Sequence, residues 1–384
     1  MLAGVLVVAA AVAAVVVLLY QGAALWLARG MPRLDPLPPP ATDEPQPGVG
    51  VVVAARDEDQ DLPETLASLR AQDLPGLEVV VVESRSPGAA VRPPPASDPL
   101  VRRLEEPPLP AGWVGKNWAC WVGAHEVRAP WLLFLDADVR LAPTAVRTTV
   151  AWAAGEGASL ATIAPRVEMA SAWERTVLPF YVQMVLTYFR APHVNRDRSR
   201  AAMANGQYWL VRRADYEALG GHEAVRGQLL EDVAIARRFR AAGRRLRLAW
   251  APELAATRMY RDRHEMFEGL LKNVHGTEFS AWRQLAFLAG LVGFFWLPLA
   301  VLPIGLLAAS LPLVTIGAVL AVALFAKHAA FARAVGAPAR YGLLFPVAVG
   351  FYVALVLTSL GRGVRGGSVT WKGRSYRLGP RRSP

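Results

Sequence analysis

The feature that most restricts the possible folds of this chain is a long stretch without charge near its start. Residues 2–28, LAGVLVVAAAVAAVVVLLYQGAALWLA, hold no charged side chain. A helix of this length is long enough to cross a bilayer. A cleaved signal peptide is the alternative, but it usually has a basic start and a shorter apolar core, and neither is seen here. We therefore predict an uncleaved transmembrane anchor over residues 1–29.

Three more apolar blocks follow toward the C-terminus, at about residues 285–308, 310–326 and 341–361. Buried core helices are the alternative interpretation, but such long runs with so little charge are uncommon in soluble domains. We expect a C-terminal membrane region over 281–361 and a basic tail over 362–384. The polar region between the first block and these three predicts a globular domain held between membrane segments.

The charge of the tail conflicts with a simple topology. A cytoplasmic domain after one anchor, followed by three crossings, would place the C-terminus outside. The arginines of the tail favour the inside. Either one late segment is re-entrant or interfacial, or the charge preference is overridden. We favour the first alternative, since the short turn between 308 and 310 makes those two blocks a tight hairpin or a re-entrant pair.

The net charge of +11 raises the question of nucleic-acid binding. The basic residues are scattered or lie beside the apolar segments, as Arg29, Arg33 and the tail do. This placement fits anionic lipid and cytoplasmic retention better than a groove for nucleic acid. We expect no nucleic-acid partner, a multi-pass protein of the inner membrane and a cytoplasmic domain. The single cysteine, Cys120, excludes an internal disulfide and fits that location.

Between the membrane segments the pattern is that of an α/β domain. Residues 30–48 are rich in proline and predict an extended linker. Short apolar, β-branched runs at 49–56, 77–84 and 131–138 predict buried strands, and segments with helical spacing lie between them. Strands that are apolar on both faces indicate a mostly parallel sheet. We place this domain at 49–280.

Two aspartates, Asp136 and Asp138, follow the buried run WLLFL, and Arg56 and Glu83 close the two earlier strands. Ligands of parallel sheets bind at the carboxyl ends of strands. Two carboxylates this close are costly unless a cation or a proton lies between them. Three interpretations remain: a turn that caps the helix expected near Pro143, a haloacid-dehalogenase-like phosphatase with Asp136 as nucleophile, and a Mg²⁺ or Mn²⁺ site that holds a diphosphate.

The strand ending in Asp-Ala-Asp, after an opening VVVAARDED strand, resembles the family 2 glycosyltransferases of the GT-A fold, a Rossmann-like α/β fold. The likeness continues in GWVGKNWACWVGA (112–124), in the segment 205–243 with its LLEDVAIARRF helix, and in VTWKGRSYRL (369–378), which is similar to a C-terminal signature of membrane-bound members. The subgroup most similar in these motifs is the bacterial enzymes associated with hopanoid and carotenoid glycosylation.

The resemblance implies roles at the donor side. Asp138 would coordinate the metal ion, and Asp136 would contact the metal or the ribose of the nucleotide. The metal would neutralise the leaving diphosphate. Arg56 and Glu83 lie where the family holds the base and the ribose, and Lys116 would direct a positive charge toward the nucleotide. Taken alone, Lys116 is equally well a solvated lysine at a helix end.

At the acceptor side, the resemblance makes Asp232 the catalytic base, which removes the proton of the acceptor hydroxyl in an inverting transfer. An acid that stabilises a helix N-terminus is the alternative for Asp232. Glu231, which precedes it, is expected on the acceptor side together with Gly221 and His222 of the GGHE sequence. A lone histidine is more often structural than a metal ligand.

Two departures from the family pattern bear on the substrate. Many members have Asp-Asp where this chain has Glu83 and Ser84. A UDP-sugar is favoured, but the nucleotide stays open. The Gln-x-x-Arg-Trp motif of polymer-forming relatives is missing after Asp232, where MYRDRHEMFEGLLKNVHG stands instead. This predicts transfer of a single sugar.

The acceptor is expected to be a membrane lipid with a hydroxyl group, such as a carotenoid or hopanoid, because the anchors hold the domain at the bilayer. The aromatic segment 171–192 predicts either a core helix or an interfacial helix. The alternatives to a metal-dependent, inverting, non-processive glycosyltransferase are the phosphatase named above and a non-catalytic membrane scaffold.

Overall fold

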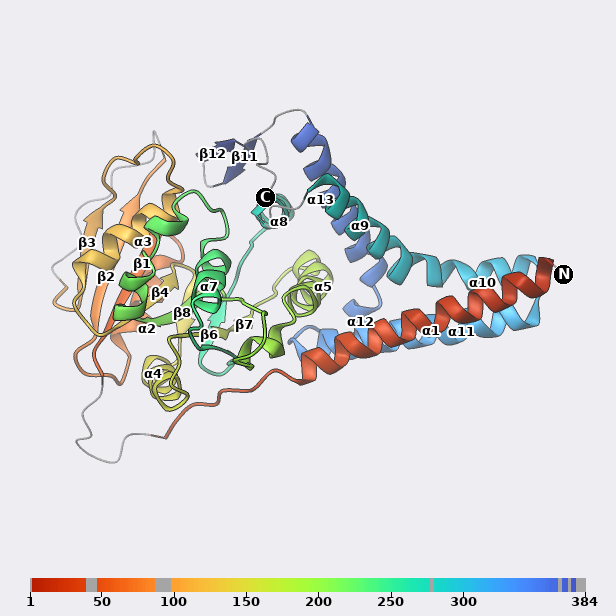
Figure 1. Cartoon of the computed structure of the whole chain (residues 1–384), viewed down its shortest axis with the longest axis horizontal. Helices are drawn as coiled ribbons and strands as arrows, with labels where there is room; N and C mark the ends of the chain where they lie inside the picture. Colours follow the sequence, from red (N-terminus) through yellow and green to blue (C-terminus); the bar gives the residue numbers. More distant parts are fainter. Residues whose placement is uncertain are drawn as a thin grey trace.

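The computed structural model describes residues 2–38, 47–86, 98–276, 280–364, 368–371 and 374–377. An α/β domain lies at one end of the molecule, and long apolar helices extend from it (Figure 1). The N-terminus lies at the far end of these helices, whereas the C-terminal hairpin lies beside the domain.

The main sheet of the domain has the strand order β3-β2-β1-β4-β8-β6-β9. Its strands are β1 (Val49–Arg56), β2 (Glu78–Ser84), β3 (Val101–Glu105), β4 (Trp131–Asp136), β6 (Leu160–Ala164), β8 (Tyr208–Arg212) and β9 (Leu246–Trp250). The paired strands are parallel except that β8 runs antiparallel to β4 and β6. The central strands are apolar on both faces because helices cover both. The prediction of a mostly parallel α/β fold is confirmed.

Helices and a small second sheet complete the domain. The helices are α2 (Leu62–Arg70), α3 (Gly115–Glu126), α4 (Ala145–Gly155), α5 (Ala172–Tyr188), α6 (Arg213–Ala218), α7 (Glu231–Ala241) and α8 (Arg263–Gly276). The second sheet joins β5 (Val139–Leu141), β10 (Ala255–Thr257) and β7 (Arg166–Val167). Its strand β5 begins directly after Asp138, so Asp136 ends β4 and Asp138 lies in the turn between the two sheets.

Helix α5 corresponds to the aromatic segment for which a core and an interfacial position were both open. It begins with a capping box, in which the Ser171 hydroxyl accepts from the Glu174 N–H and the Glu174 carboxylate accepts from the Ser171 N–H. Most of its apolar side chains are buried, with Val177 and Leu178 completely so. The helix packs against α1, α11 and α13. It is therefore a core helix, placed where the domain meets the apolar helices.

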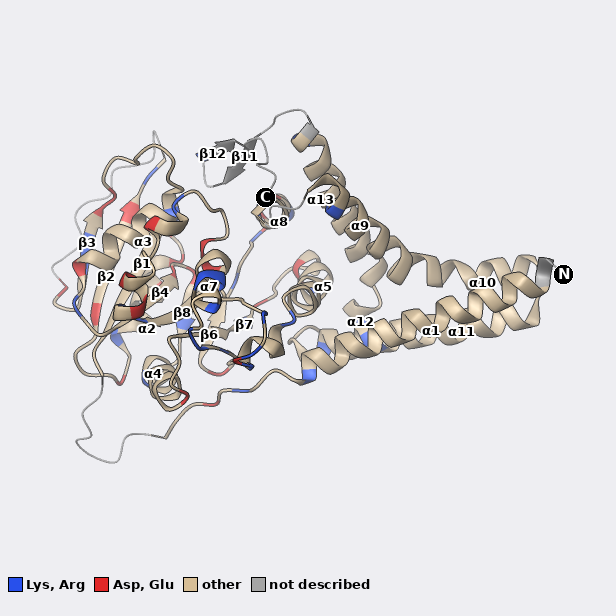
Figure 2. Ribbon diagram, in the orientation of Figure 1, with Lys and Arg blue, Asp and Glu red and all other residues tan. Residues whose placement is uncertain are grey.

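The apolar helices are α1 (Leu2–Arg29), α9 (Ala281–Leu291), α10 (Leu297–Leu307), α11 (Leu311–Ala334), α12 (Ala339–Gly342) and α13 (Phe345–Val364), with a π-helical turn (Val292–Trp296) joining α9 to α10. Within the described residues, the segments 4–29, 281–307, 311–334 and 345–363 are long and apolar enough to cross a membrane. Figure 2 draws this part almost entirely in tan, and its few charged residues lie toward the domain.

Helices α10 and α11 form the tight hairpin expected for the two blocks. A Cβ atom on Gly305 would lie 2.6 Å from the Val314 nitrogen, and one on Gly317 would lie 2.4 Å from the Leu302 nitrogen. Larger residues would force the two backbones apart. Helix α1 packs along α11, so these three helices form one bundle that points away from the domain (Figure 1).

Helix α13 follows a different path. It packs against α5, α8 and α9 instead of joining the far part of the bundle, and both of its ends lie near the domain (Figure 1). After it, strands β11 (Ser368–Trp371) and β12 (Arg374–Arg377) form a hairpin, and β11 lies against α8. The described part of the tail therefore lies beside the domain.

The proline-rich linker starts along the edge of the main sheet. The Leu34 N–H donates to the Trp250 carbonyl at 2.9 Å, and the Trp250 N–H donates to the Pro32 carbonyl at 2.8 Å. These bonds extend the sheet beyond β9. Residues 39–46 of the predicted linker lie outside the described residues.

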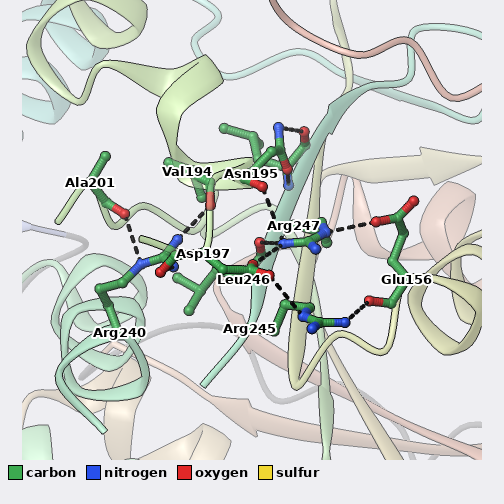
Figure 3. Close-up of polar contacts among 10 residues, drawn as sticks. Glu156, Val194, Asn195, Asp197, Ala201, Arg240, Arg245, Leu246 and Arg247 are labelled. Carbon is green, nitrogen blue, oxygen red and sulfur yellow. Dashed lines mark hydrogen bonds and ion pairs between the residues drawn. The ribbon is translucent and has the colours of Figure 1, made fainter. Parts of the chain in front are cut away.

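An arginine network anchors the connection from α5 to β8 (Figure 3). On β9, Arg247 pairs with Glu156 at 2.9 Å and with Asp197 at 2.8 Å. The Asn195 side chain exchanges hydrogen bonds with the backbone of Leu248 at 2.9 and 2.8 Å. Arg240 donates from α7 to backbone carbonyls of the same connection. This network positions the chain that leads into the functional site.

Candidate active site

One cavity of about 390 Å³ opens at the carboxyl ends of β1 and β4. Its wall includes several of the residues that the sequence singled out: Arg56, Lys116, Asp136, Asp138, Glu231 and Asp232. These residues come from two strand ends and from the first turns of α3 and α7. The fold thus brings together side chains that are more than 170 positions apart in the sequence.

The two aspartates of the Asp-Ala-Asp sequence have different environments. The Asp136 carboxylate forms an ion pair with the Lys116 ammonium at 2.7 Å. The Asp138 carboxylate accepts a hydrogen bond from the Thr257 hydroxyl at 3.2 Å. Burial, and then the nearby Asp136 charge, raise the pKa of Asp138 to about 7. Neither aspartate caps the following helix, because the N-cap residue of α4 is Thr144.

Lys116 lies at the centre of the charged part of the cavity. Its ammonium pairs with Glu231 at 2.9 Å as well as with Asp136, and it donates to the Gly206 carbonyl at 3.4 Å. Burial would lower the pKa of Lys116, but the two carboxylates outweigh it and raise that pKa well above its usual value. Lys116 is therefore a permanent cation in the cavity and not a solvated helix-end lysine.

Glu231 and Asp232 occupy the first turn of α7, and the pKa values of their carboxyl groups are shifted in opposite directions. Burial disfavours the Glu231 carboxylate, but Lys116 outweighs this and lowers its pKa. Burial and the Glu231 charge raise the pKa of Asp232 to about 7. The Asp232 carboxylate accepts from the Val233 N–H at 2.8 Å, as expected for an acid at a helix N-terminus. A carboxyl group with a pKa near neutrality can also accept a proton at physiological pH.

No group of three or more His, Cys, Asp or Glu side chains suited to a metal is present among the residues that the structure describes. The pair Asp136 and Asp138 nevertheless has the chemistry that Mg²⁺ and Mn²⁺ prefer, because both offer carboxylate oxygens in one cavity. Burial and then the Asp136 charge raise the pKa of Asp138, and a bound cation would offset both effects. These residues fit a cation that also takes oxygen ligands from a bound substrate.

At the end of the first two strands, only part of the expected pair faces the cavity. Arg56 lines it and donates to the Ser84 hydroxyl at 3.4 Å and to the Ser86 hydroxyl at 3.2 Å. Glu83 instead pairs with Arg103 on β3 at 2.9 Å, and Ser84 lines the cavity beside Arg56.

Gly221 and His222, expected on the acceptor side, lie behind the cavity wall. His222 is completely buried, and its ring nitrogen Nδ1 lies 2.7 Å from the Tyr216 hydroxyl. The ring packs edge-on against Phe134. Burial lowers the pKa of His222 to about 3, so the ring is neutral. His222 thus packs against the sheet through Phe134 and Trp209, and Gly221 lies against the Tyr216 ring.

Several cavity residues were not predicted from the sequence. Lys272 on α8 and Tyr181 on α5 line the wall near the carboxyl groups, and so does Arg374 from the C-terminal hairpin. Burial raises the pKa of Tyr181 to about 12, so its hydroxyl keeps its proton. Lys272 lies in the segment MYRDRHEMFEGLLKNVHG that stands in place of the Gln-x-x-Arg-Trp motif, and that position was its only signal in the sequence.

The cavity also has an extended apolar part. Val185 on α5, Leu270 on α8, Phe287 on α9 and Val356 on α13 line it together with the charged residues. Helices α9 and α13 belong to segments that are apolar enough to cross a membrane. One continuous cavity therefore joins the carboxyl groups at the strand ends to the membrane-like helices.

Comparison with protein families gives a match over residues 45–275 to the model described as glycosyltransferase like family 2. This range holds most of the α/β domain and all the cavity carboxyl groups discussed above. A 4,4'-diaponeurosporenoate glycosyltransferase of Staphylococcus haemolyticus is 22% identical over 193 residues, which are 50% of this chain and 51% of the relative. The match thus spans about half the length of that relative.

Solved structures of similar arrangement include the mannosyltransferase PcManGT from Pyrobaculum calidifontis in complex with GDP-Man and Mn²⁺. It is 16% identical, with a TM-score of 0.48, over 92% of this chain and 97% of that one. Glucosyl-3-phosphoglycerate synthase from Mycobacterium tuberculosis, in complex with Mn²⁺, UDP and phosphoglyceric acid, is 16% identical with a TM-score of 0.37, over 60% of this chain and 78% of that one.

Proposed function

The chain belongs to the glycosyltransferase-like family 2, and from this premise we propose that it transfers one sugar from a nucleotide-sugar donor to a hydroxyl group of a membrane lipid. The observation that carries the proposal is the single cavity that contains both the charged strand ends and apolar side chains of α9 and α13. A substrate with a charged diphosphate suits the first part, and one with an apolar body suits the second.

The donor is proposed to bind where Arg56, Lys116 and the Asp-Ala-Asp turn meet. Asp136 and Asp138 are the residues that would hold Mg²⁺ or Mn²⁺, which would neutralise charge on the leaving diphosphate. Lys116 holds Asp136 and Glu231 in place and adds a fixed positive charge beside the same region. Arg56 is positioned by Ser84 and Ser86 at the rim of the donor region.

Asp232 is the proposed base of an inverting transfer. Its carboxylate would accept the proton of the acceptor hydroxyl while that oxygen attacks the anomeric carbon, and the bond from this carbon to the diphosphate oxygen breaks. A pKa of about 7 suits a base that must take up and release a proton in each cycle. Glu231 stays ionised through its pair with Lys116, and this charge raises the basicity of its neighbour.

The acceptor is proposed to be a hydroxyl-bearing lipid, such as a carotenoid or hopanoid. Support comes from Phe287 and Val356, which lie in the cavity wall but belong to segments that can cross a membrane. The relative from Staphylococcus haemolyticus is named a 4,4'-diaponeurosporenoate glycosyltransferase, which agrees with an extended apolar acceptor. The missing polymerisation motif favours one sugar per acceptor.

Calorimetry with UDP and GDP, each with and without Mn²⁺, tests the donor side directly. We expect binding of at least one nucleoside diphosphate that strengthens with Mn²⁺. Asp138→Asn should remove most of the Mn²⁺ dependence, because it deletes charge from the cation site. The matched control is Asp98→Asn, which removes an aspartate paired with Arg70 outside the cavity and should leave binding unchanged.

The same experiment separates the two alternatives. A phosphatase with Asp136 as nucleophile would form an aspartyl-phosphate there and release inorganic phosphate, with no need for a nucleoside. A membrane scaffold would bind no nucleotide under any condition. Either result would overturn the proposed transfer.

A further inference from the structure

The C-terminal hairpin reaches the cavity through Arg374. This residue opens β12, and its guanidinium pairs with Glu106 through two contacts, Nη1 to Oε1 at 3.1 Å and Nη2 to Oε2 at 2.5 Å. The Glu106 side chain is only 4% exposed. A two-point pair with a buried carboxylate fixes both the position and the plane of the guanidinium.

Arg374 also lies against the first turn of α3. A Cβ atom built on Gly115 would lie 1.7 Å from Nη1 of Arg374, so glycine is required for the guanidinium to come this close. The next residue is Lys116, which pairs with Asp136. Arg374, Lys116 and Arg56 all line the same cavity. The hairpin therefore places the Arg374 guanidinium in the part of the cavity that the N-terminus of α3, Lys116 and Arg56 also line.

We propose that the C-terminal hairpin completes the donor part of the cavity, and that Arg374 binds phosphate oxygens of the nucleoside diphosphate while Glu106 orients it. This inference rests on the proposed function. A guanidinium can bind a carboxylate along one edge and a phosphate along another, and the N–H groups at the start of α3 favour an anion at the same place. Arg374 thus acquires a role in binding the donor, although it follows the last apolar helix.

The test compares variants of the full-length protein in detergent. Arg374→Gln should weaken UDP or GDP binding in the presence of Mn²⁺ by about 10-fold or more, as expected for loss of a charge-assisted hydrogen bond. Affinity for uridine or guanosine, measured by displacement of a fluorescent nucleotide, should stay unchanged because the nucleoside has no phosphate. Arg374→Lys keeps the charge and should restore part of the affinity.

Two controls separate phosphate binding from a structural role. Arg102→Gln removes an arginine that pairs with Glu126 on the far edge of the sheet, and it should not change nucleotide binding. Glu106→Gln breaks the same ion pair as Arg374→Gln but keeps the arginine, so its loss of affinity should be smaller. Thermal melting of each variant reports on folding.

Wild-type affinity for UDP and GDP in Arg374→Gln would overturn this inference and leave the proposed function intact. Equal losses in Glu106→Gln and Arg374→Gln, or an equal loss for nucleoside and diphosphate, would show that the pair only supports the fold. If the wild type binds neither diphosphate with Mn²⁺, the proposed function and this inference both fall.

Discussion

Lys116 divides the cavity carboxyl groups discussed here into two kinds. Asp136 and Glu231 lie within 3 Å of its ammonium and share its charge. Asp138 and Asp232 have pKa values of about 7, raised by burial and by the charges of those same two neighbours. Two acids with raised pKa values therefore remain beside this lysine, and we propose that Asp138 binds a cation and Asp232 accepts a proton.

For single residues we expect a pH dependence to which Asp232 contributes, and saturating donor and Mn²⁺ keep the contribution of Asp138 small. A base works only when deprotonated, so the transfer rate per enzyme should be full above the pKa of about 7 and should fall as the pH decreases through it. Asp232→Asn should lower turnover by about 100-fold or more while nucleoside diphosphate binding persists. The rate is measured with saturating donor in membranes or detergent.

Asp262→Asn is the matched control, because Asp262 also lies at the start of a helix and accepts from the Glu265 N–H, but it does not line the cavity. Its activity should equal that of the wild type. Normal turnover in Asp232→Asn, with normal donor binding, would show that the base lies elsewhere.

The sequence could predict the site residues that follow strands or open helices in recognisable motifs. Five such residues meet in one cavity: Lys116, Asp136, Asp138, Glu231 and Asp232. Local sequence cannot tell which way a side chain turns. Glu83 turns toward Arg103 because β3 lies beside β2, and this neighbour is known only from the sheet order.

In helix α3 the spacing of the motif residues explains how the helix packs. Gly115, Lys116, Ala119 and Gly123 are spaced so that they recur on the face toward the sheet and the cavity. Ala119 is buried, and a Cβ atom on Gly123 would lie 2.4 Å from the Val52 side chain. The spacing therefore lets α3 lie close to the sheet while its first turn faces the cavity, and a sequence pattern can predict that.

Other elements depend on partners far along the chain. Strand β8 lies between β4 and β6 and runs against both, which its own sequence does not reveal. Helix α13 is as apolar as a membrane span, but it packs on α5 and α8. In both cases the position of the element depends on its contacts with segments far along the chain, and its own sequence does not specify these contacts.

Lys327 of α11 lies at the joint between domain and bundle. Its ammonium contacts the side-chain oxygens of Gln21 on α1 at 2.8 Å and Gln183 on α5 at 2.5 Å. Lys327→Met would leave both amide oxygens without this donor and should lower the free energy of unfolding by about 1–3 kcal/mol. Thermal melting in detergent measures the effect.

Arg333→Met is the control for Lys327→Met, since Arg333 is an exposed cation near the end of the same helix. It should leave the melting temperature unchanged. An unchanged melting temperature for Lys327→Met as well would mean that the amides find other partners and that this contact does not hold the joint together.

For the whole molecule, the path of the chain favours one solution of the conflict between the number of crossings and the charge of the tail. The bundle of α1, α10 and α11 points away from the domain, whereas α13 begins and ends near it, and Arg374 contacts Glu106 (Figure 1). We expect the first, second and third apolar segments to cross the membrane and α13 to lie in the membrane surface on the side of the domain. The N-terminus would then be outside and the tail inside.

Cysteine labelling of intact cells checks this topology, because the native Cys120 is buried. A side chain at Gly4, Gly155 or Gly363 would meet no other atom within 4 Å. With a membrane-impermeant thiol reagent, Gly4→Cys should react in intact cells, whereas Gly155→Cys in the domain and Gly363→Cys after α13 should react only after permeabilisation. Reaction of Gly363→Cys together with Gly4→Cys would mean that α13 crosses.

The continuity of the cavity from strand ends to apolar helices has a kinetic consequence. If the acceptor enters beside α9 and α13, it never passes through water, and its concentration is a surface density in the bilayer instead of a molarity. Adding inert lipid then dilutes the acceptor although the volume of the sample is unchanged, whereas the donor is still counted per litre. The rate would then depend on the acceptor through its amount per area of membrane and on the donor through its amount per volume of solution.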